Sequence, residues 1–419
     1  MLIKLIYVSI LFVCALSEKF RFDNYTLYQI APKNVEHVKV LQDLQNTGLE
    51  YDFWDDVTPV SDYINVLSKP GLKANLESFL KNAGIEYVLF TQLLKIPFRL
   101  IDRETSKSYS RNNFRSMTWE SYYTMHDINA WLDDMVAAHS SVASIIIGGK
   151  SHEGRDIKGI KISHGAGRRA VFIESGIHAR EWIAPATTNF IINELLTSED
   201  EEIKAIAHDY DWYIFPVTNP DGYIWSHVGF RLWRKNRAPY GEHIGVDLNR
   251  NWNDNWLKES VSTNPASDVF AGLGPFSEIE TRTLSSYIIS LADKIDLYLS
   301  FHSSGQILLL PFGNTTEPLA NYHDLAIGRR AMGALSVRHG TEYTSGNIAE
   351  AIYFATGTSI DWVKEHLKIP LCYCYELRDR RVYGHLLPPD QILPNSEEVM
   401  DSIVEMILQA KRFGYMNGT

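Results

Sequence analysis

The feature that most limits what this chain can fold into is the alternation, after about residue 116, of almost uninterrupted apolar runs with amphipathic segments. The apolar runs predict strands over residues 142–148, 157–162, 170–174, 210–217, 296–302 and 370–376. Helical periodicity marks residues 126–139, 182–196, 278–292, 319–338, 359–367 and 396–413. Such buried strands interleaved with helices are typical of a mixed, mostly parallel twisted sheet with helices on both faces. We therefore expect one α/β domain over residues 116–419.

The segment ahead of this domain has a different order of elements. Its periodicity predicts strands at residues 25–31, 51–54, 62–67 and 85–90, and helices at 34–46 and 72–82. The order β-α-β-β-α-β is that of a ferredoxin-like sandwich. We expect a small α+β domain here.

A basic stretch joins the two domains. Arg99, Arg103, Lys107, Arg111 and Arg115 recur every four residues through a polar segment. This spacing keeps the charges near one side of a helix, so the stretch can be an ordinary solvated helical face. It can also be a linker that exposes basic sites to a trypsin-like protease, because nicking concentrates in exposed segments between domains. On that second interpretation, residues 18–115 are an activation pro-segment made of the ferredoxin-like domain and a connecting helix.

The first 17 residues have the layout of a secretory signal peptide. Lys4 precedes an apolar run that ends at Leu16, and small residues stand at Ala15 and Ser17. The run is too short for a membrane anchor, which needs about 20 apolar residues. Sequons at Asn24, Asn314 and Asn417 agree with a secreted, extracellular glycoprotein.

Charge and cysteine content exclude several classes. The formal net charge of −11 argues against a nucleic-acid binder, which needs a basic face. No segment after the first 17 residues is apolar enough to suggest a membrane partner. Cys372 and Cys374 stand two apart in one predicted strand, so they are poorly placed to form a disulfide. We expect a monomer.

The chemistry-bearing residues follow the predicted strands. His178 and Glu181 come shortly after the strand at 170–174, His302 ends the strand at 296–302, and Glu376 ends the strand at 370–376. Catalytic residues in open α/β sheets collect at the carboxyl ends of strands. Two imidazoles and one carboxylate, with a fourth position open, suit a catalytic Zn²⁺. A His-x-x-Glu pair is common by chance, however, so this spacing does not decide the matter.

Seven motifs occur in a fixed order along the chain. They are His178-Ala-Arg-Glu181-Trp182, Asn219-Pro-Asp-Gly222, Arg231-Leu-Trp-Arg234-Lys235, Asp247-Leu-Asn249-Arg250-Asn251-Trp252, Phe301-His302-Ser303, Ile352-Tyr353 and Glu376-Leu-Arg-Asp379. The series resembles the zinc metallocarboxypeptidases of the pancreatic carboxypeptidase A/B type in their zymogen form. The resemblance extends over essentially everything after the signal peptide.

The resemblance implies a role for each residue of the reaction centre. His178, Glu181 and His302 would hold one zinc ion, and Asp247 would accept the N–H of a ligand imidazole. Glu376 would be the general base that takes a proton from the zinc-bound water and passes it to the leaving amine. Arg234 would stabilise the tetrahedral oxyanion.

The resemblance also assigns the residues that bind the substrate, a peptide or protein C-terminus. Arg250, with Asn249 beside it, would bind the terminal carboxylate, and Tyr353 would close over the bound residue. Arg180 would contact the substrate further upstream, and Ser303 belongs to the same binding set.

The pocket for the terminal side chain would be lined by Leu309, Gly313, Ile348, Ile352, Ala355, Thr358, Ile360 and Cys374. Relatives that remove C-terminal basic residues carry Asp at position 360. Ile360 offers no counter-charge, and an unpaired buried Lys or Arg is costly. We therefore expect a carboxypeptidase A-like preference for large hydrophobic or aromatic C-terminal residues. Ser304 and His385 depart from the usual Tyr and Phe, which leaves the upstream preferences open.

Two other functions compete with this hypothesis. One is a B-like or broad carboxypeptidase, which turnover of different terminal residues would reveal. The other is a catalytically silent secreted binding protein on the same scaffold. The complete set of three ligands, Glu376 and Arg234 disfavours the silent protein.

Overall fold

The computed structural model describes residues 22, 24–46, 51–54, 57, 63–89, 117–317, 321–380 and 382–416. In the large domain, eight strands form one mixed sheet in the order β13-β12-β14-β11-β7-β8-β6-β5. The strands are β5 (Ala143–Lys150), β6 (Asp156–Ile162), β7 (Ala170–Ser175), β8 (Asp211–Phe215), β11 (Ile295–Ser303), β12 (Ile307–Leu310), β13 (Thr344–Asn347) and β14 (Leu371–Leu377). The central strands β14, β11, β7 and β8 are parallel, while β5 and β6 add an antiparallel edge.

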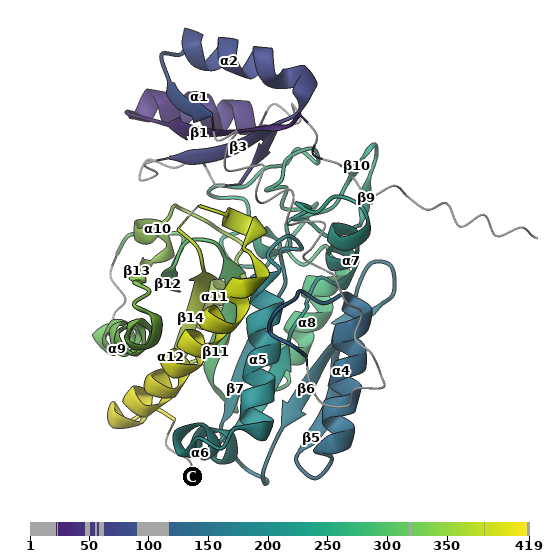
Figure 1. The fold of residues 1–419 in the computed structure, drawn as a ribbon, viewed down its shortest axis with the longest axis vertical. Helices are drawn as coiled ribbons and strands as arrows, with labels where there is room; N and C mark the ends of the chain where they lie inside the picture. The colour runs from purple at the N-terminus through teal and green to yellow at the C-terminus, as the bar shows by residue number, and fades with distance from the viewer. Residues whose placement is uncertain are drawn as a thin grey trace, which may run out of the picture.

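Helices cover both faces of this sheet, as predicted (Figure 1). One face packs against α4 (Met125–Ala138), α5 (Ile183–Thr197), α6 (Glu201–Asp209), α9 (Tyr322–His339) and α12 (Ile392–Arg412). The other face packs against α8 (Ile279–Ile289), α10 (Ile348–Ala351) and α11 (Ser359–Leu367). Each face buries its own apolar cluster, which is why the central strands are apolar on both sides.

Some elements were not predicted. The six predicted strands are all present, but β12 and β13 are four-residue strands too short to produce a clear pattern. The helices α6, α7 (Pro220–Val228) and α10 and the small hairpin of β9 (Pro239–Tyr240) and β10 (His243–Ile244) were also missed. In α7, Asn219 accepts a hydrogen bond from the Gly222 amide and Pro220 occupies the first turn. The Asn219-Pro220 dipeptide, a sequence that often marks a turn, therefore begins a helix here.

The small domain is ferredoxin-like, as predicted. It consists of β1 (Thr26–Ala31), α1 (Val35–Asn46), β2 (Tyr51–Phe53), β3 (Ile64–Ser68), α2 (Lys73–Asn82) and β4 (Glu86–Leu89). Its antiparallel strands follow the order β2-β3-β1-β4. Figure 1 shows this domain seated on one end of the large domain. The proposed signal peptide and the basic stretch at residues 99–115 lie outside the described residues.

Strand register places chemistry-bearing residues side by side at one end of the sheet. His302 of β11 is in register with Glu376 of the parallel strand β14, and Ile307 of β12 is in register with Glu376. Because side chains alternate between the faces of a strand, these residues share one face. Cys372 and Cys374 of β14 are buried free thiols. None of the helices in the part of the chain that the structure describes is long and apolar enough to cross a membrane.

Candidate active site and metal centre

A tight loop after β7 presents the first two metal-binding side chains. Gly176 adopts φ +64°, and a Cβ at this position would lie 3.1 Å from the carbonyl oxygen of Pro216. Only glycine fits such a conformation without strain. The turn that follows brings His178 Nδ1 to 2.9 Å from Glu181 Oε1. The expected meeting of these two side chains is confirmed.

His302 reaches the same point from β11. Its Nδ1 lies 3.0 Å from His178 Nδ1 and 3.1 Å from Glu181 Oε2. All three side chains are buried, and their ligand atoms lie within 4.8 Å of one another. Two imidazole nitrogens that face each other this closely need a shared cation or proton between them. Two imidazoles and a carboxylate fit zinc, so these residues can hold the ion.

The electrostatics of this cluster favour a cation. Burial alone would raise the pKa of Glu181, but His178 and His302 hold it well below its ordinary value. Burial likewise opposes charge on His302, yet the neighbouring Glu181 raises the pKa of His302 to about 9. The carboxylate is therefore ionised, and it faces two nitrogen ligands.

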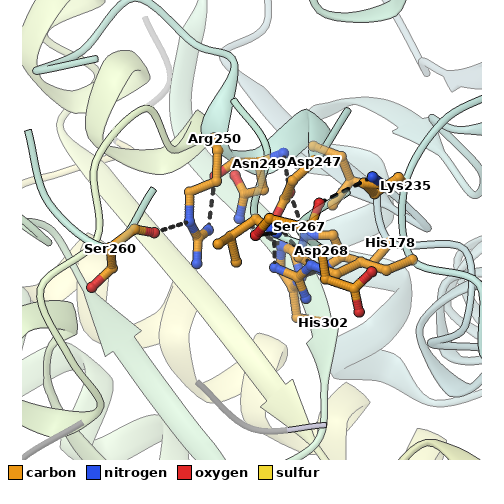
Figure 2. Close-up of polar contacts among 12 residues, drawn as sticks. His178, Lys235, Asp247, Asn249, Arg250, Ser260, Ser267, Asp268 and His302 are labelled. Atoms are coloured by element: carbon orange, nitrogen blue, oxygen red, sulfur yellow. Dashed lines mark hydrogen bonds and ion pairs between the residues drawn. The ribbon is translucent and has the colours of Figure 1, made fainter. Parts of the chain in front are cut away.

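Asp247 connects the metal-binding cluster to an arginine. Its Oδ1 lies 3.1 Å from His178 Nε2, and its Oδ2 accepts hydrogen bonds from Arg234 Nε at 2.9 Å and Nη2 at 2.7 Å. Burial opposes its ionisation, but Arg234 and His178 hold the pKa of Asp247 well below its ordinary value. Figure 2 shows Asp247 in this cluster with His178 and His302. The carboxylate orients a ligand imidazole on one side and a guanidinium on the other.

A second arginine stands beside the cluster on a short 3₁₀ turn (Leu248–Arg250). Arg250 donates from Nη1 to the carbonyl oxygen of Asn249 at 2.9 Å and from Nη2 to Tyr353 Oη at 2.8 Å. Its Nε donates to the carbonyl oxygen of Ser260 at 3.3 Å (Figure 2). Asn249 Oδ1 accepts the amide of Ser359 at 2.9 Å, which ties this turn to the start of α11.

These groups line one open cavity. It is lined by Trp54, His178, Glu181, Arg234, Asn249, Arg250, His302, Ser303, Ser304, Ile307, Ile352, Tyr353, Glu376 and His385. Most residues singled out from the sequence therefore lie around one space. Asp247 lies behind the cavity wall, and Ile360 is buried in an apolar cluster with Leu309, Ile348 and Cys374.

The remaining predicted residue, Arg180, faces the small domain. Its Nη1 donates to Asp52 Oδ1 at 3.0 Å and its Nη2 to the carbonyl oxygen of Phe53 at 3.3 Å. Trp54 follows directly and lines the cavity, with its ring centroid 6.2 Å from that of His385. Sequence reasoning missed this contact, because nothing local in residues 51–54 marks a partner 128 residues away.

The pair of Asp52 and Arg180 is held in a buried setting. Burial raises the pKa of Asp52 to about 7, Arg180 opposes that rise, and Asp268 adds to it. Asp268 Oδ2 lies 3.8 Å from Arg180 Nη1, so two carboxylates compete for one guanidinium.

The fold and site define an α/β metal-dependent hydrolase whose active-site entrance is covered by an N-terminal domain. Residues 128–402 match the zinc carboxypeptidase family, and residues 28–92 match the carboxypeptidase activation peptide. The chain belongs to the zinc carboxypeptidase family and carries the activation peptide of its zymogens.

Named relatives agree with this family. The chain is 39% identical over 411 residues to zinc carboxypeptidase A 1 of Drosophila melanogaster, covering 96% of this chain and 95% of the relative. It is 40% identical to carboxypeptidase B of Astacus astacus, over 68% of this chain and 96% of the relative. The crystal structure of carboxypeptidase A from Helicoverpa armigera matches with a TM-score of 0.84 and 30% identity, over 93% of this chain and 98% of that one. Relatives named A and B are similarly close, so the names alone do not transfer a terminal-residue preference.

Proposed function

We propose that this chain is a secreted zymogen of a zinc carboxypeptidase that removes large hydrophobic or aromatic C-terminal residues from peptides. The observation that carries the proposal is the shared cavity, which joins the zinc ligands, Glu376 and Arg250. In this proposal residues 1–17 are a signal peptide, 18–115 the activation pro-segment and 116–419 the catalytic domain. The enzyme is an extracellular glycoprotein, works as a monomer, and is activated by a trypsin-like protease.

The reaction needs a base and an oxyanion donor at fixed places. His178, Glu181 and His302 would hold a zinc ion, which would supply a Lewis acid and lower the pKa of water toward 7. Glu376, beside His302 in register, takes the proton of the attacking water and returns it to the leaving amine. Arg234, oriented by Asp247, donates to the oxyanion.

Exopeptidase action follows from Arg250. Arg250 lines the cavity, two backbone carbonyls orient its guanidinium, and a planar guanidinium matches the geometry of a carboxylate. Tyr353 already contacts Arg250 and can close over a substrate bound there. Only the C-terminal residue of a peptide has a free α-carboxylate next to the scissile bond, so binding of that carboxylate restricts cleavage to the terminal bond.

The preference for apolar termini rests on Ile360. Its side chain is 2% exposed and lies among apolar neighbours, with no ionic group of its own to pair with a Lys or Arg. Burial of an unpaired cation costs several kcal/mol, about the scale that separates good substrates from poor ones.

Latency follows from the position of the small domain. Asp52 and the Phe53 carbonyl occupy Arg180, and Trp54 stands in the cavity where upstream substrate residues would lie. Removal of the pro-segment frees all three positions.

The proposal is tested by treating the secreted protein with trypsin and offering matched peptides that end in Phe or Lys. We expect release of Phe only after cleavage, and much faster release of Phe than of Lys. Faster release of Lys would contradict the proposed preference and favour the B-like enzyme.

Replacing Glu376 with Gln separates catalysis from binding. The variant should keep stoichiometric zinc but lose turnover, because an amide cannot accept the proton. Retained activity would remove Glu376 from the mechanism. Zinc binding without any turnover in the wild-type protein would indicate the silent binding protein instead.

A further inference from the structure

A row of four side chains lies one step below the reaction centre. Ser300 of β11 is in register with Glu174 of β7 and with Cys374 of β14, and Cys374 is in register with Leu309 of β12. The row is two residues below His302, which is about 6.6 Å along a strand, and it shares the same face. Cys374 and Leu309 belong to the proposed pocket for the terminal side chain, so under the proposed function this row would lie at its deep end.

Glu174 is the charged member of this row, and the mechanism does not use it. Its side chain is fully buried. Its Oε1 accepts hydrogen bonds from Ser300 Oγ at 2.6 Å, Ser359 Oγ at 3.1 Å and Tyr298 Oη at 3.3 Å. Its Oε2 has no hydrogen-bond partner among the described residues. A buried acid with an unpaired oxygen calls for a functional explanation.

These contacts fix the direction of two hydroxyl protons. A serine hydroxyl has one proton and two lone pairs. Ser300 and Ser359 both direct their proton to Glu174, so their oxygens can only accept any further hydrogen bond. Ser300 adjoins Cys374 in the row, and Ser359 precedes Ile360 at the start of α11. In the proposed pocket for the terminal side chain, these two positions would therefore offer acceptors and no hydroxyl donor.

We infer that Glu174 sets the terminal-residue preference by holding Ser300 and Ser359 as acceptors, so that the enzyme favours C-terminal tyrosine over phenylalanine and rejects C-terminal glutamate. An aromatic side chain anchored at the level of His302 is about long enough to place its tip at this row. A phenol can donate to the fixed acceptors, phenylalanine cannot, and a carboxylate meets only acceptors. Glu174 is a positioning residue in this inference, which rests on the proposed function.

The test compares kcat/KM for matched peptides that end in Tyr, Phe or Glu, with the trypsin-activated enzyme. One hydrogen bond in such a setting changes the rate ratio by between about twofold and tenfold, so Tyr should exceed Phe by that factor. Glu174→Gln keeps the shape, but its amide can donate to Ser300 and turn the serine proton toward the pocket. The Tyr-to-Phe ratio should then fall to one or below, and Glu-terminated peptides should gain relative to Phe.

Tyr298→Phe is the matched control. It removes the third hydroxyl at Glu174, but Tyr298 lies a further two residues down the strand, so the ratio should stay at its wild-type value. A merely structural role for Glu174 would lower all three kcat/KM values together and leave the ratios unchanged.

Equal rates for Tyr and Phe in the wild-type enzyme, or an unchanged ratio in Glu174→Gln, would overturn the inference. Should Glu174→Gln be recovered without zinc, Ser300→Ala carries the same test, because it removes one acceptor and should lower the ratio. Absence of Phe release by a zinc-loaded, activated enzyme would instead defeat the proposed function itself.

Discussion

At the scale of single residues, Asp247 connects a metal-binding side chain to an arginine. One of its oxygens faces His178 and the other accepts two hydrogen bonds from Arg234. It is fully buried, so loss of the carboxylate would leave His178 Nε2 without this acceptor inside the protein. The metal-binding residue His178 and the proposed oxyanion donor Arg234 are therefore coupled through one acid.

Replacing Asp247 with Asn should weaken zinc binding by about 10- to 100-fold, the usual effect of losing the acceptor behind a ligand histidine. The amide also turns a donor toward Arg234 or His178, so kcat should fall even at saturating zinc. Both are measured by titration against a graded chelator and by steady-state kinetics. Unchanged zinc affinity would show that Asp247 only packs behind the site.

Gly176 gives a second prediction at this scale. Gly176→Ala should lower the free energy of unfolding by about 1–2 kcal/mol through the left-handed backbone alone. It should also reduce zinc affinity, because the new methyl group would press on Pro216 after β8 and displace the loop that carries His178. Gly154→Ala is the matched control, since Gly154 has φ +84° but open space around its Cβ. Its zinc affinity should not change, and equal zinc affinity in both variants would contradict the steric argument.

At the scale of elements, β2 of the small domain contacts the loop that carries Arg180. We expect the strength of this contact to depend on pH. The pKa of Asp52 is about 7 in the docked state and that of an exposed Asp is about 3.9, so the docked state binds the extra proton. Its contribution to docking is complete below the exposed pKa and is lost as the pH rises through 7. Asp52, Arg180 and Asp268 are the charged groups that face one another here.

We therefore expect the cleaved pro-segment to stay bound to the catalytic domain at pH 5.5 and to dissociate more readily at pH 8.5. Size-exclusion chromatography of the trypsin-treated protein at the two values measures this. Asp52→Asn should flatten the difference, because the titrating group is gone. Tighter binding at pH 8.5 than at pH 5.5 in the wild-type protein would contradict the assignment.

At the scale of the whole molecule, the metal cage joins segments far apart in the chain. It ties the loop between β7 and α5 to the end of β11, on residues 178, 181 and 302. A ligand that binds only the native state adds RT ln(1 + [L]/Kd), about 2.7 kcal/mol at 100 times Kd.

Chelation should accordingly lower the Tm of the activated enzyme by several degrees, and added zinc should restore it. Differential scanning calorimetry with and without chelator tests this. His302→Ala serves as the control, because its Tm should respond much less to zinc. Equal Tm values for the zinc-loaded and zinc-free wild-type enzyme would contradict a structural contribution of the metal.

Much of this architecture could be predicted from sequence, and the failures have physical causes. Long apolar strands and amphipathic helices carry strong periodic signals, so the sheet, its two helical layers and the ferredoxin-like domain were predicted. The residues His178, Glu181, His302 and Glu376 were found because strand ends collect chemistry in α/β sheets. Four-residue strands such as β12 are too short for their alternation of apolar and polar residues to be recognised in the sequence. The contact of Asp52 with Arg180 and the burial of Glu174 depend on tertiary packing, which no local window of sequence contains.

The row at residues 302 and 376 and the row at residues 300 and 374 suggest how the substrate specificity of such an enzyme could change. In our proposals, bond cleavage depends on the upper row, with 302 and 376, whereas selection of the terminal residue depends on the row with 300 and 374 beneath it. Substitutions in the lower row can retune what is accepted while the hydrolytic apparatus stays intact. New substrate ranges would then be reachable by mutation at a handful of buried positions, without any passage through an inactive intermediate.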